Sequence, residues 1–228
     1  MRRKHINASM TIRAIIFDMD GVLIDSEHLW QQTEKAIFGE LGFDLSDELL
    51  VQTRGLRTEE MVAHWSARFP MDGIDVVSLM EEYDRCMVET MLREVPLMEG
   101  ARELISFFRD KGLPVALATC STQAHIDAVM EKHGLRDSFD LLVSAARNMQ
   151  GKPHPEVYLY TAEKLKVDPT QCLAFEDSFF GVVAAKAARM KVVAMPDRSE
   201  YDQERFGAAD LKIRSLTEFT SETFEKLQ

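Results

Sequence analysis

Five short apolar segments alternate with amphipathic helical patterns along most of this chain, and that alternation constrains the fold more than any other feature. The predicted strands cover residues 11–18, 113–119, 139–145, 171–177 and 191–195. Helical spacing of apolar side chains recurs between them, over residues 100–112, 122–134 and 154–167. Strands separated by helices of this length pair in parallel, with helices on both faces. The pattern therefore predicts an α/β fold with a Rossmann-like, doubly wound parallel sheet.

Residues 28–94 interrupt this alternation with helical patterns alone. The simplest interpretation is a helical insertion between the first strand and the rest of the sheet. We therefore expect an α/β core over residues 10–27 and 95–228, a helical cap domain over 28–94, and a flexible tail over 1–9.

Charge and cysteine content narrow the possible partners and setting. The chain carries 27 basic and 38 acidic residues, a net charge of −11, which argues against nucleic acid because duplex binding depends on a basic face. The three cysteines are widely spaced and odd in number, which is typical of a reducing compartment. No apolar run approaches the ~20 residues of a membrane span. We expect a cytoplasmic protein, monomeric by default, with no nucleic-acid or membrane partner.

Polar side chains follow the ends of four of these segments or come soon after them. In open parallel sheets, ligands bind beyond the C-terminal ends of the strands. The sequence places acids, hydroxyls, a thiol and a lysine there, namely Asp18 and Asp20; Thr119, Cys120 and Ser121; Lys152; and Glu176 and Asp177. We therefore expect these groups to converge at one edge of the sheet.

The chemistry of such a pocket follows from its charges. Asp18, Asp20 and Asp177 cannot all lie close together and ionised without a cation, and hard oxygen ligands of this kind favour Mg²⁺. Lys152 and Thr119 supply a positive charge and a hydroxyl donor that suit the oxygens of a phosphoryl group. A carboxylate nucleophile can then form an aspartyl-phosphate. Because residues i and i+2 of a strand share a face, Asp20 could reach the leaving oxygen as general acid.

Four motifs give the chain a resemblance to a known family. The segments FDMDGVLIDSE, LATCST, GKPHPEVYL and FEDSFFGVVAAKAA resemble the motifs of the haloacid dehalogenase-like hydrolases, in the branch of β-phosphoglucomutase and small sugar-phosphate phosphatases. The resemblance extends from about residue 12 to residue 218. IFDMDGVLIDSEHLW, GLRTEEMV and AARMKVVAMP are most similar to 2-deoxyglucose-6-phosphate and hexitol-phosphate phosphatases. The resemblance implies an Mg²⁺-dependent phosphatase of small phosphorylated sugars or sugar alcohols, with a helical cap that closes over the substrate.

The resemblance also implies roles for individual residues in catalysis. Asp18 is expected to be the nucleophile that attacks phosphorus. Asp20 is expected to protonate the leaving alcohol and later to deprotonate the attacking water. Thr119 is expected to hold the transferring phosphoryl group, with the backbone of Cys120 and the side chain of Ser121 nearby. Lys152 is expected to neutralise the nucleophile and the phosphate.

Further roles concern the metal and the cap. Asp177 and the backbone carbonyl of Asp20 are expected to bind Mg²⁺ beside Asp18, and Glu176 either holds a metal-bound water or supports Lys152. Arg57, or less favourably Arg54, is expected to contact substrate from the cap. Glu27 is a second cap candidate, although Ser26 and Glu27 also suit the start of a helix.

Three alternatives to a phosphatase stay open. A phosphosugar mutase uses the same scaffold, but the mutase branch has a histidine that assists the general acid, and this chain has Trp30 there. A signalling receiver shares the acidic pocket, hydroxyl and lysine, but it lacks a long helical insertion after the first strand. A catalytically inactive sugar-phosphate sensor is disfavoured because every reactive position is filled.

Overall fold

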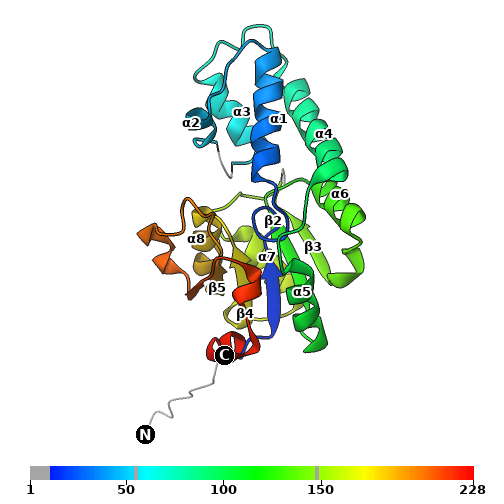
Figure 1. The fold of residues 1–228 in the computed structure, drawn as a ribbon, viewed down its shortest axis with the longest axis vertical. Helices are drawn as coiled ribbons and strands as arrows, with labels where there is room; N and C mark the ends of the chain where they lie inside the picture. Colours follow the sequence, from blue (N-terminus) through cyan, green and yellow to red (C-terminus); the bar gives the residue numbers. More distant parts are fainter. Residues whose placement is uncertain (1–10, 54–55, 147–148) are drawn as a thin grey trace, which may run out of the picture.

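The computed structural model describes residues 11–53, 56–146 and 149–228, and its centre is a six-stranded sheet (Figure 1). The predicted tail over 1–9 and Arg54 lie outside these residues. The strands are β1 (Ala14–Phe17), β2 (Val115–Thr119), β3 (Leu141–Ser144), β4 (Cys172–Glu176), β5 (Lys191–Ala194) and β6 (Leu211–Lys212). All neighbours pair in parallel, in the order β3-β2-β1-β4-β5-β6. The α/β class and the five predicted strands are confirmed, and β6 is an addition.

Alternation along β1 explains why this strand lies at the centre. Its four residues are fully buried, and successive side chains point to opposite faces. Ile15 and Phe17 enter one apolar cluster with the aromatic rings of Phe108 and Phe175. Ala14 and Ile16 enter a second cluster on the other face. Both faces therefore need a covering layer of helices.

Five α-helices among the described residues from 101 onward supply those layers. They are α5 (Ala101–Asp110), α6 (Gln123–His133), α7 (Glu156–Leu165), α8 (Phe179–Ala187) and α9 (Ser221–Lys226). Apolar side chains of α5 and α9 pack in the cluster with Phe17, whereas those of α7 and α8 pack in the cluster with Ile16. The sheet is thus covered on both faces, as the sequence predicted.

In the described part of the chain between β1 and α5, four helices are present, and they extend away from the sheet (Figure 1). They are α1 (Glu27–Glu40), α2 (Asp47–Leu50), α3 (Thr58–Ser66) and α4 (Val76–Glu94), and we call them the helical unit. The described residues of 27–94 contain no strand. Two backbone hydrogen bonds join the segments that enter and leave the unit, Asp25 N to Pro96 O and Met98 N to Leu23 O.

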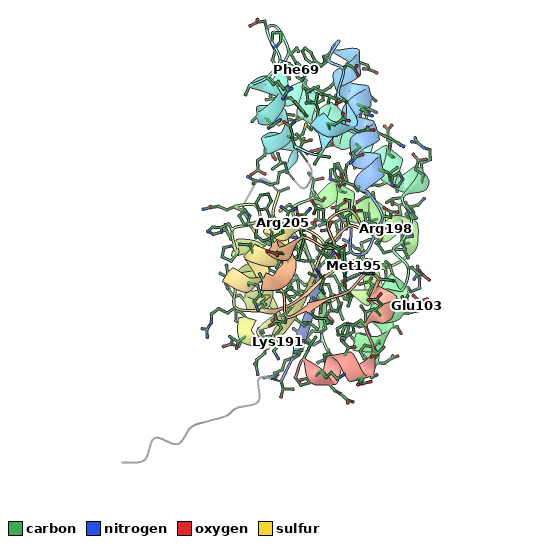
Figure 2. The ribbon with its side chains drawn as sticks, turned by 60° about the vertical axis from the view of Figure 1, so that its left-hand side comes forward. Phe69, Glu103, Lys191, Met195, Arg198 and Arg205 are labelled. Atoms are coloured by element: carbon green, nitrogen blue, oxygen red, sulfur yellow. The ribbon has the colours of Figure 1, made fainter. Side chains whose placement is uncertain are left out.

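The helical unit lies beyond the C-terminal ends of the strands. In Figure 2, Lys191 at the start of β5 is far from Phe69 in the helical unit, and Met195 just past the end of β5 is nearer to it. The edge predicted to hold the site therefore faces the helices. Among the described residues, no helix is both long and apolar enough to cross a bilayer.

Candidate active site

A cavity of about 540 Å³ lies at this edge, between the strand ends and the helical unit. Every predicted site residue except Glu176 lines it: Asp18, Asp20, Glu27, Arg57, Thr119, Cys120, Ser121, Lys152 and Asp177. Glu176 lies beneath the lining and is fully buried. The chain therefore brings together groups that are up to 160 positions apart in sequence.

Asp18, Lys152 and Glu176 form the buried centre of the site. Lys152 Nζ lies 2.9 Å from Asp18 Oδ1 and 2.5 Å from Glu176 Oε1. The Lys152 side chain is 7% exposed, that of Asp18 9% and that of Glu176 0%. Tyr158 donates its hydroxyl to Glu176 Oε1, and Ser178 Oγ donates to Glu176 Oε2 at 3.3 Å. Of the two expected roles for Glu176, this geometry matches support of Lys152.

Among the described residues, carboxyl groups outnumber the cations at this centre. Burial raises the pKa of Asp18 to about 7; the nearby Glu176 and Asp20 also raise it, and Lys152 opposes them. Burial alone would lower the pKa of Lys152, but Asp18 and Glu176 outweigh it and hold that pKa well above its ordinary value. One lysine thus faces several carboxyl groups, and a further cation would favour their ionised forms.

The donor set fits a hard cation beside a bound anion. Asp18, Glu176 and Asp177 each offer a carboxylate oxygen, and these oxygens lie within 4.8 Å of one another. Asp18 Oδ1 and Lys152 Nζ are buried, and neither has a hydrogen-bond partner of good geometry. Buried polar atoms normally have such partners, so these two suit a ligand that supplies them. Carboxylate oxygens are ligands that Mg²⁺ prefers.

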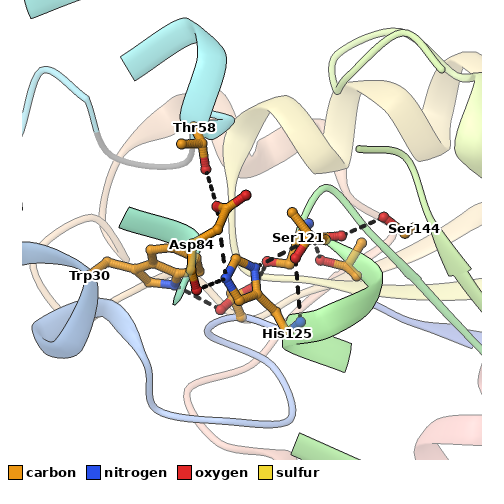
Figure 3. Close-up of polar contacts among 9 residues, drawn as sticks. Trp30, Thr58, Asp84, Ser121, His125 and Ser144 are labelled. Atoms are coloured by element: carbon orange, nitrogen blue, oxygen red, sulfur yellow. Dashed lines mark hydrogen bonds and ion pairs between the residues drawn. The ribbon is translucent and has the colours of Figure 1, made fainter. Parts of the chain in front are cut away.

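Asp20 accepts three hydrogen bonds from two segments, the start of α1 and the loop after β2. Trp30 and Ser121, one donor from each segment, are labelled in Figure 3. Ser26 Oγ donates to its Oδ1 at 2.6 Å, and Trp30 Nε1 donates to the same oxygen at 2.9 Å. Ser121 Oγ donates to Oδ2 at 2.6 Å. Ser26 precedes α1 but makes no capping bond with its side chain. Its hydroxyl serves Asp20 instead, so the helix-start interpretation accounts for its position and not for its hydroxyl.

The loop after β2 contributes a buried hydroxyl and a thiol. Thr119 is 2% exposed, and its Oγ1 accepts the backbone N–H of Ser121 at 3.1 Å. Burial raises the pKa of the Cys120 thiol, which keeps the sulfur protonated at neutral pH. Cys120 is therefore suited to a backbone contact and unsuited to a nucleophile.

The two cap candidates are placed differently from each other. Arg57 precedes α3, and its Nη1 donates across the cavity to the backbone oxygen of Met149 at 3.2 Å, while Nη2 pairs with Glu60 at 2.7 Å. Its Nε is buried without a hydrogen bond. Arg57 thus links the helical unit to the loop that carries Lys152. Glu27 begins α1, lines the cavity and accepts a hydrogen bond from Gln31 at 2.8 Å.

Two contacts of the site were missed by sequence reasoning. Tyr158 belongs to the motif GKPHPEVYL and stands six residues after Lys152. This short separation in the sequence could have indicated that Tyr158 lies near the site. Trp30 was named only because it stands where the mutase branch has a histidine, and its hydrogen bond to Asp20 was not predicted. Both contacts depend on how a helix is rotated about its axis relative to a neighbouring loop. A single sequence does not determine that rotation.

Comparisons with known proteins agree with this geometry. A family model described as haloacid dehalogenase-like hydrolase matches residues 15–195. The chain is similar to hexitol phosphatase B of Escherichia coli (strain K12), with 42% identity over 211 residues that cover 92% of this chain and 95% of that protein.

Solved structures show the same fold. The crystal structure of CbbY from Rhodobacter sphaeroides in complex with phosphate superposes with a TM-score of 0.83 at 26% identity, covering 91% of this chain and 96% of that one. β-Phosphoglucomutase from Clostridium difficile gives a TM-score of 0.81 at 23% identity, covering 95% and 96%, a likeness of fold alone. On the family match and the similarity to hexitol phosphatase B, this chain belongs to the haloacid dehalogenase-like hydrolases.

Proposed function

We propose that this protein is an Mg²⁺-dependent phosphatase that hydrolyses small phosphorylated sugars or sugar alcohols through an aspartyl-phosphate. The observation that carries the proposal is the buried pair of Asp18 Oδ1 and Lys152 Nζ, 2.9 Å apart and without hydrogen bonds of good geometry. A phosphoryl group placed beside them gives Lys152 an acceptor and brings phosphorus to the carboxylate. The nearby Asp177 extends the same site with a further oxygen ligand.

Charge neutralisation makes the first step feasible. An ionised Asp18 must approach a phosphoryl dianion, and two like charges ~4 Å apart repel by about 4 kcal/mol at an effective dielectric near 20. Lys152 offsets part of this repulsion because it contacts Asp18 directly. Mg²⁺, held by Asp18, Asp177 and the backbone carbonyl of Asp20, would supply the remaining positive charge. Thr119 and Ser121 provide hydroxyl and amide donors next to the transferring group.

Asp20 is assigned the proton transfers. Its carboxyl group gives a proton to the leaving alcohol as the bond to Asp18 forms, and it then removes a proton from the water that attacks the aspartyl-phosphate. The nucleophile and the acid are separated by one residue, and both line the cavity. This arrangement divides the labour between two carboxyl groups.

The polar face of α1 supports a polyhydroxylated substrate. Glu27, Gln31 and Glu34 follow one another at helical spacing, and all three line the cavity opposite the strand ends. Carboxylate and amide oxygens in this position suit the hydroxyl groups of a sugar or a hexitol. The 42% identity with hexitol phosphatase B over 92% of this chain supports the same substrate class.

The helical unit is assigned as a cap. We propose a cap domain over residues 28–94 and an α/β core over 10–27 and 95–228, because the cavity lies between the two parts. Arg57 supports this assignment, since it bridges the helical unit and the Lys152 loop.

A phosphate-release panel tests the proposal. The panel contains sorbitol 6-phosphate, 2-deoxyglucose 6-phosphate, glucose 6-phosphate, phosphoglycolate and a nucleoside monophosphate, each with Mg²⁺ or with EDTA. We expect the highest kcat/KM with a hexitol or hexose phosphate, and loss of activity in EDTA that Mg²⁺ restores. Equal activity across the panel removes the sugar assignment, and no phosphate release removes the phosphatase. Formation of glucose 6-phosphate from β-glucose 1-phosphate without net phosphate release would indicate the mutase instead.

A further inference from the structure

We infer that Trp30 is a positioning residue for proton transfer, and that its indole N–H fixes which oxygen of Asp20 carries the proton. The inference rests on the proposed function and concerns how the acid–base carboxyl group of that site is held. Trp30 comes from α1 in the helical unit, whereas Asp20 belongs to the loop after β1.

The three hydrogen bonds to Asp20 are divided unequally between its two oxygens. Oδ1 accepts from both Ser26 Oγ and Trp30 Nε1, whereas Oδ2 accepts from Ser121 Oγ alone among the residues that the structure describes. A carboxylate offers about two acceptor sites on each oxygen. Oδ1 is therefore saturated, and Oδ2 keeps one site for the leaving alcohol or for water.

The three donors also differ in whether they can accept a hydrogen bond from a protonated Asp20. Ser26 and Ser121 carry hydroxyl groups, which can turn from donor to acceptor when Asp20 gains a proton. The indole of Trp30 donates only. A proton on Oδ1 would make that oxygen a weaker acceptor for this N–H, so Trp30 favours the proton on Oδ2. Oδ1 is therefore the less favourable place for the proton. Oδ1 is also the oxygen that has no acceptor site left for a ligand.

Aromatic packing holds the indole in this orientation, and Figure 3 shows the His125 ring beside Trp30. The ring of Tyr83, on α4, stacks on Trp30 with centroids 5.9 Å apart and an interplanar angle of 27°. The ring of His125, on α6, meets Trp30 edge-on at 5.2 Å and 90°. His125 is buried, and its Nε2 lies 3.3 Å from the backbone oxygen of Asp84. Trp30 is thus held from the helical unit and from the sheet layer together.

The test replaces Trp30 with phenylalanine, which keeps an aromatic ring and removes the N–H. Activity is compared on two substrates that differ in their need for a proton. Sorbitol 6-phosphate releases an alkoxide that must be protonated, whereas p-nitrophenyl phosphate releases a stable phenolate. The quantity compared is kcat/KM, because it reports the steps through phosphoryl transfer and excludes later hydrolysis of the aspartyl-phosphate.

Trp30→Phe should lower kcat/KM for sorbitol 6-phosphate by about 10- to 100-fold, the range for one hydrogen bond to a charged group. For p-nitrophenyl phosphate the loss should stay below about 3-fold, since that leaving group needs no proton. Trp30→Leu also removes the N–H and should show the same selective loss, which keeps the test available if Trp30→Phe folds poorly.

Ser66→Ala is the control, because Ser66 donates its hydroxyl to the backbone oxygen of Val62 inside α3 and is not among the residues that line the cavity. This variant should leave kcat/KM unchanged for both substrates. Equal losses of kcat/KM on the two substrates in Trp30→Phe and Trp30→Leu, or no loss, overturn the inference while the phosphatase assignment stands. A wild-type protein that releases phosphate from neither substrate overturns both.

Discussion

Glu176 shows how a buried carboxylate can be held beside a lysine at the level of single residues. It is completely buried, pairs with Lys152 and accepts hydrogen bonds from Tyr158 and Ser178. Burial of an ionised group is costly unless it is paired and hydrogen-bonded, and here both conditions are met. Glu176 therefore orients Lys152 from below, while Asp18 meets the same lysine from the cavity side.

Tyr158→Phe tests this support. The substitution leaves Glu176 buried with one donor fewer, which should lower the free energy of unfolding by about 1–3 kcal/mol. Urea denaturation at neutral pH measures the change. Tyr160, two residues further along α7 and 37% exposed, gives the matched control. Tyr160→Phe should stay within about 0.5 kcal/mol of wild type. Equal effects of the two variants would contradict the assigned role of Tyr158.

The positions of the proposed site residues were predictable where these residues follow a strand. Asp18 and Asp177 stand immediately after β1 and β4, so the direction of the strands placed them at one edge. Trp30 and Tyr158 lie on helices, and their contacts depend on how each helix is rotated against a loop. No local pattern in the sequence carries that rotation.

At the scale of elements, the loop between β1 and α1 depends on Gly21. Its φ is +69°, and a Cβ there would overlap the carboxylate of Asp177. Gly21 thus lets the chain leave the strand while Asp177 lies directly against the backbone. The loop and the predicted metal ligand share one small space.

Gly21→Ala should therefore weaken Mg²⁺ binding. The added methyl group displaces the Asp177 carboxylate, and we expect the Mg²⁺ concentration for half-maximal activity to rise by ~10-fold or more. Gly42→Ala is the matched control, because Gly42 has φ +84° but no atom within 4 Å of the place that a methyl group would occupy. Both variants should lose about 1–2 kcal/mol of stability from the left-handed backbone. An equal Mg²⁺ requirement in the two variants would argue against Asp177 as a ligand.

A second prediction concerns Glu34, which is buried on α1. Burial raises its pKa above the ordinary value of 4.5, although hydrogen bonds from Trp65 and Thr53 oppose the shift. The folded state then binds this proton more tightly than the unfolded state, so the contribution of Glu34 to stability falls as pH rises above that ordinary value. Glu34→Gln should remove this loss of stability with rising pH. The melting temperature of the variant minus that of wild type should therefore be larger at pH 8 than at pH 5.

The control for Glu34 is an exposed glutamate on α7. Glu163→Gln should change the melting temperature equally at the two pH values. If Glu34→Gln behaves like Glu163→Gln, the buried carboxyl group does not set this pH dependence.

Strands and long helices were predictable as elements, and the short ones were not. Residues 14–17 and 172–176 are apolar and fully buried, which gave a clear strand pattern. β6 has two residues, both only partly buried, and its position depends on pairing with β5. The four-residue helix α2 likewise has too few residues to show a period.

For the whole molecule, the net charge of −11 extends into the cavity, where nine acidic and five basic side chains stand among the described lining residues. The basic ones are Arg57, Lys152, Arg198, Arg205 and Arg214. Figure 2 shows Arg198 and Arg205 on the side of the sheet that faces the helical unit. An anionic substrate therefore depends on these individual cations and on the proposed Mg²⁺, and not on the average charge of the cavity. The average composition therefore argued against nucleic acid as a partner but was silent about this cavity.

The overall plan of the site was predictable because parallel strands end at one edge. What the sequence left open was the distance across the cavity, which depends on how the helical unit packs on α6 and on the Lys152 loop. Arg57 illustrates this limit. Its place in the helical unit was expected, whereas its contact with Met149 joins positions 92 residues apart and arises from tertiary packing.

We propose that Asp18 attacks phosphorus, and detection of the phosphorylated residue tests this step directly. Wild-type protein is mixed with p-nitrophenyl phosphate and Mg²⁺, quenched in acid within milliseconds, and mapped by peptide mass spectrometry. Asp20→Asn should accumulate more of the adduct, because hydrolysis of the aspartyl-phosphate then lacks its base. Asp18→Asn should form none and release no phosphate. We predict one phosphoryl group on Asp18, formed at least as fast as turnover. Phosphate release without that adduct, or an adduct on another residue, would contradict this mechanism.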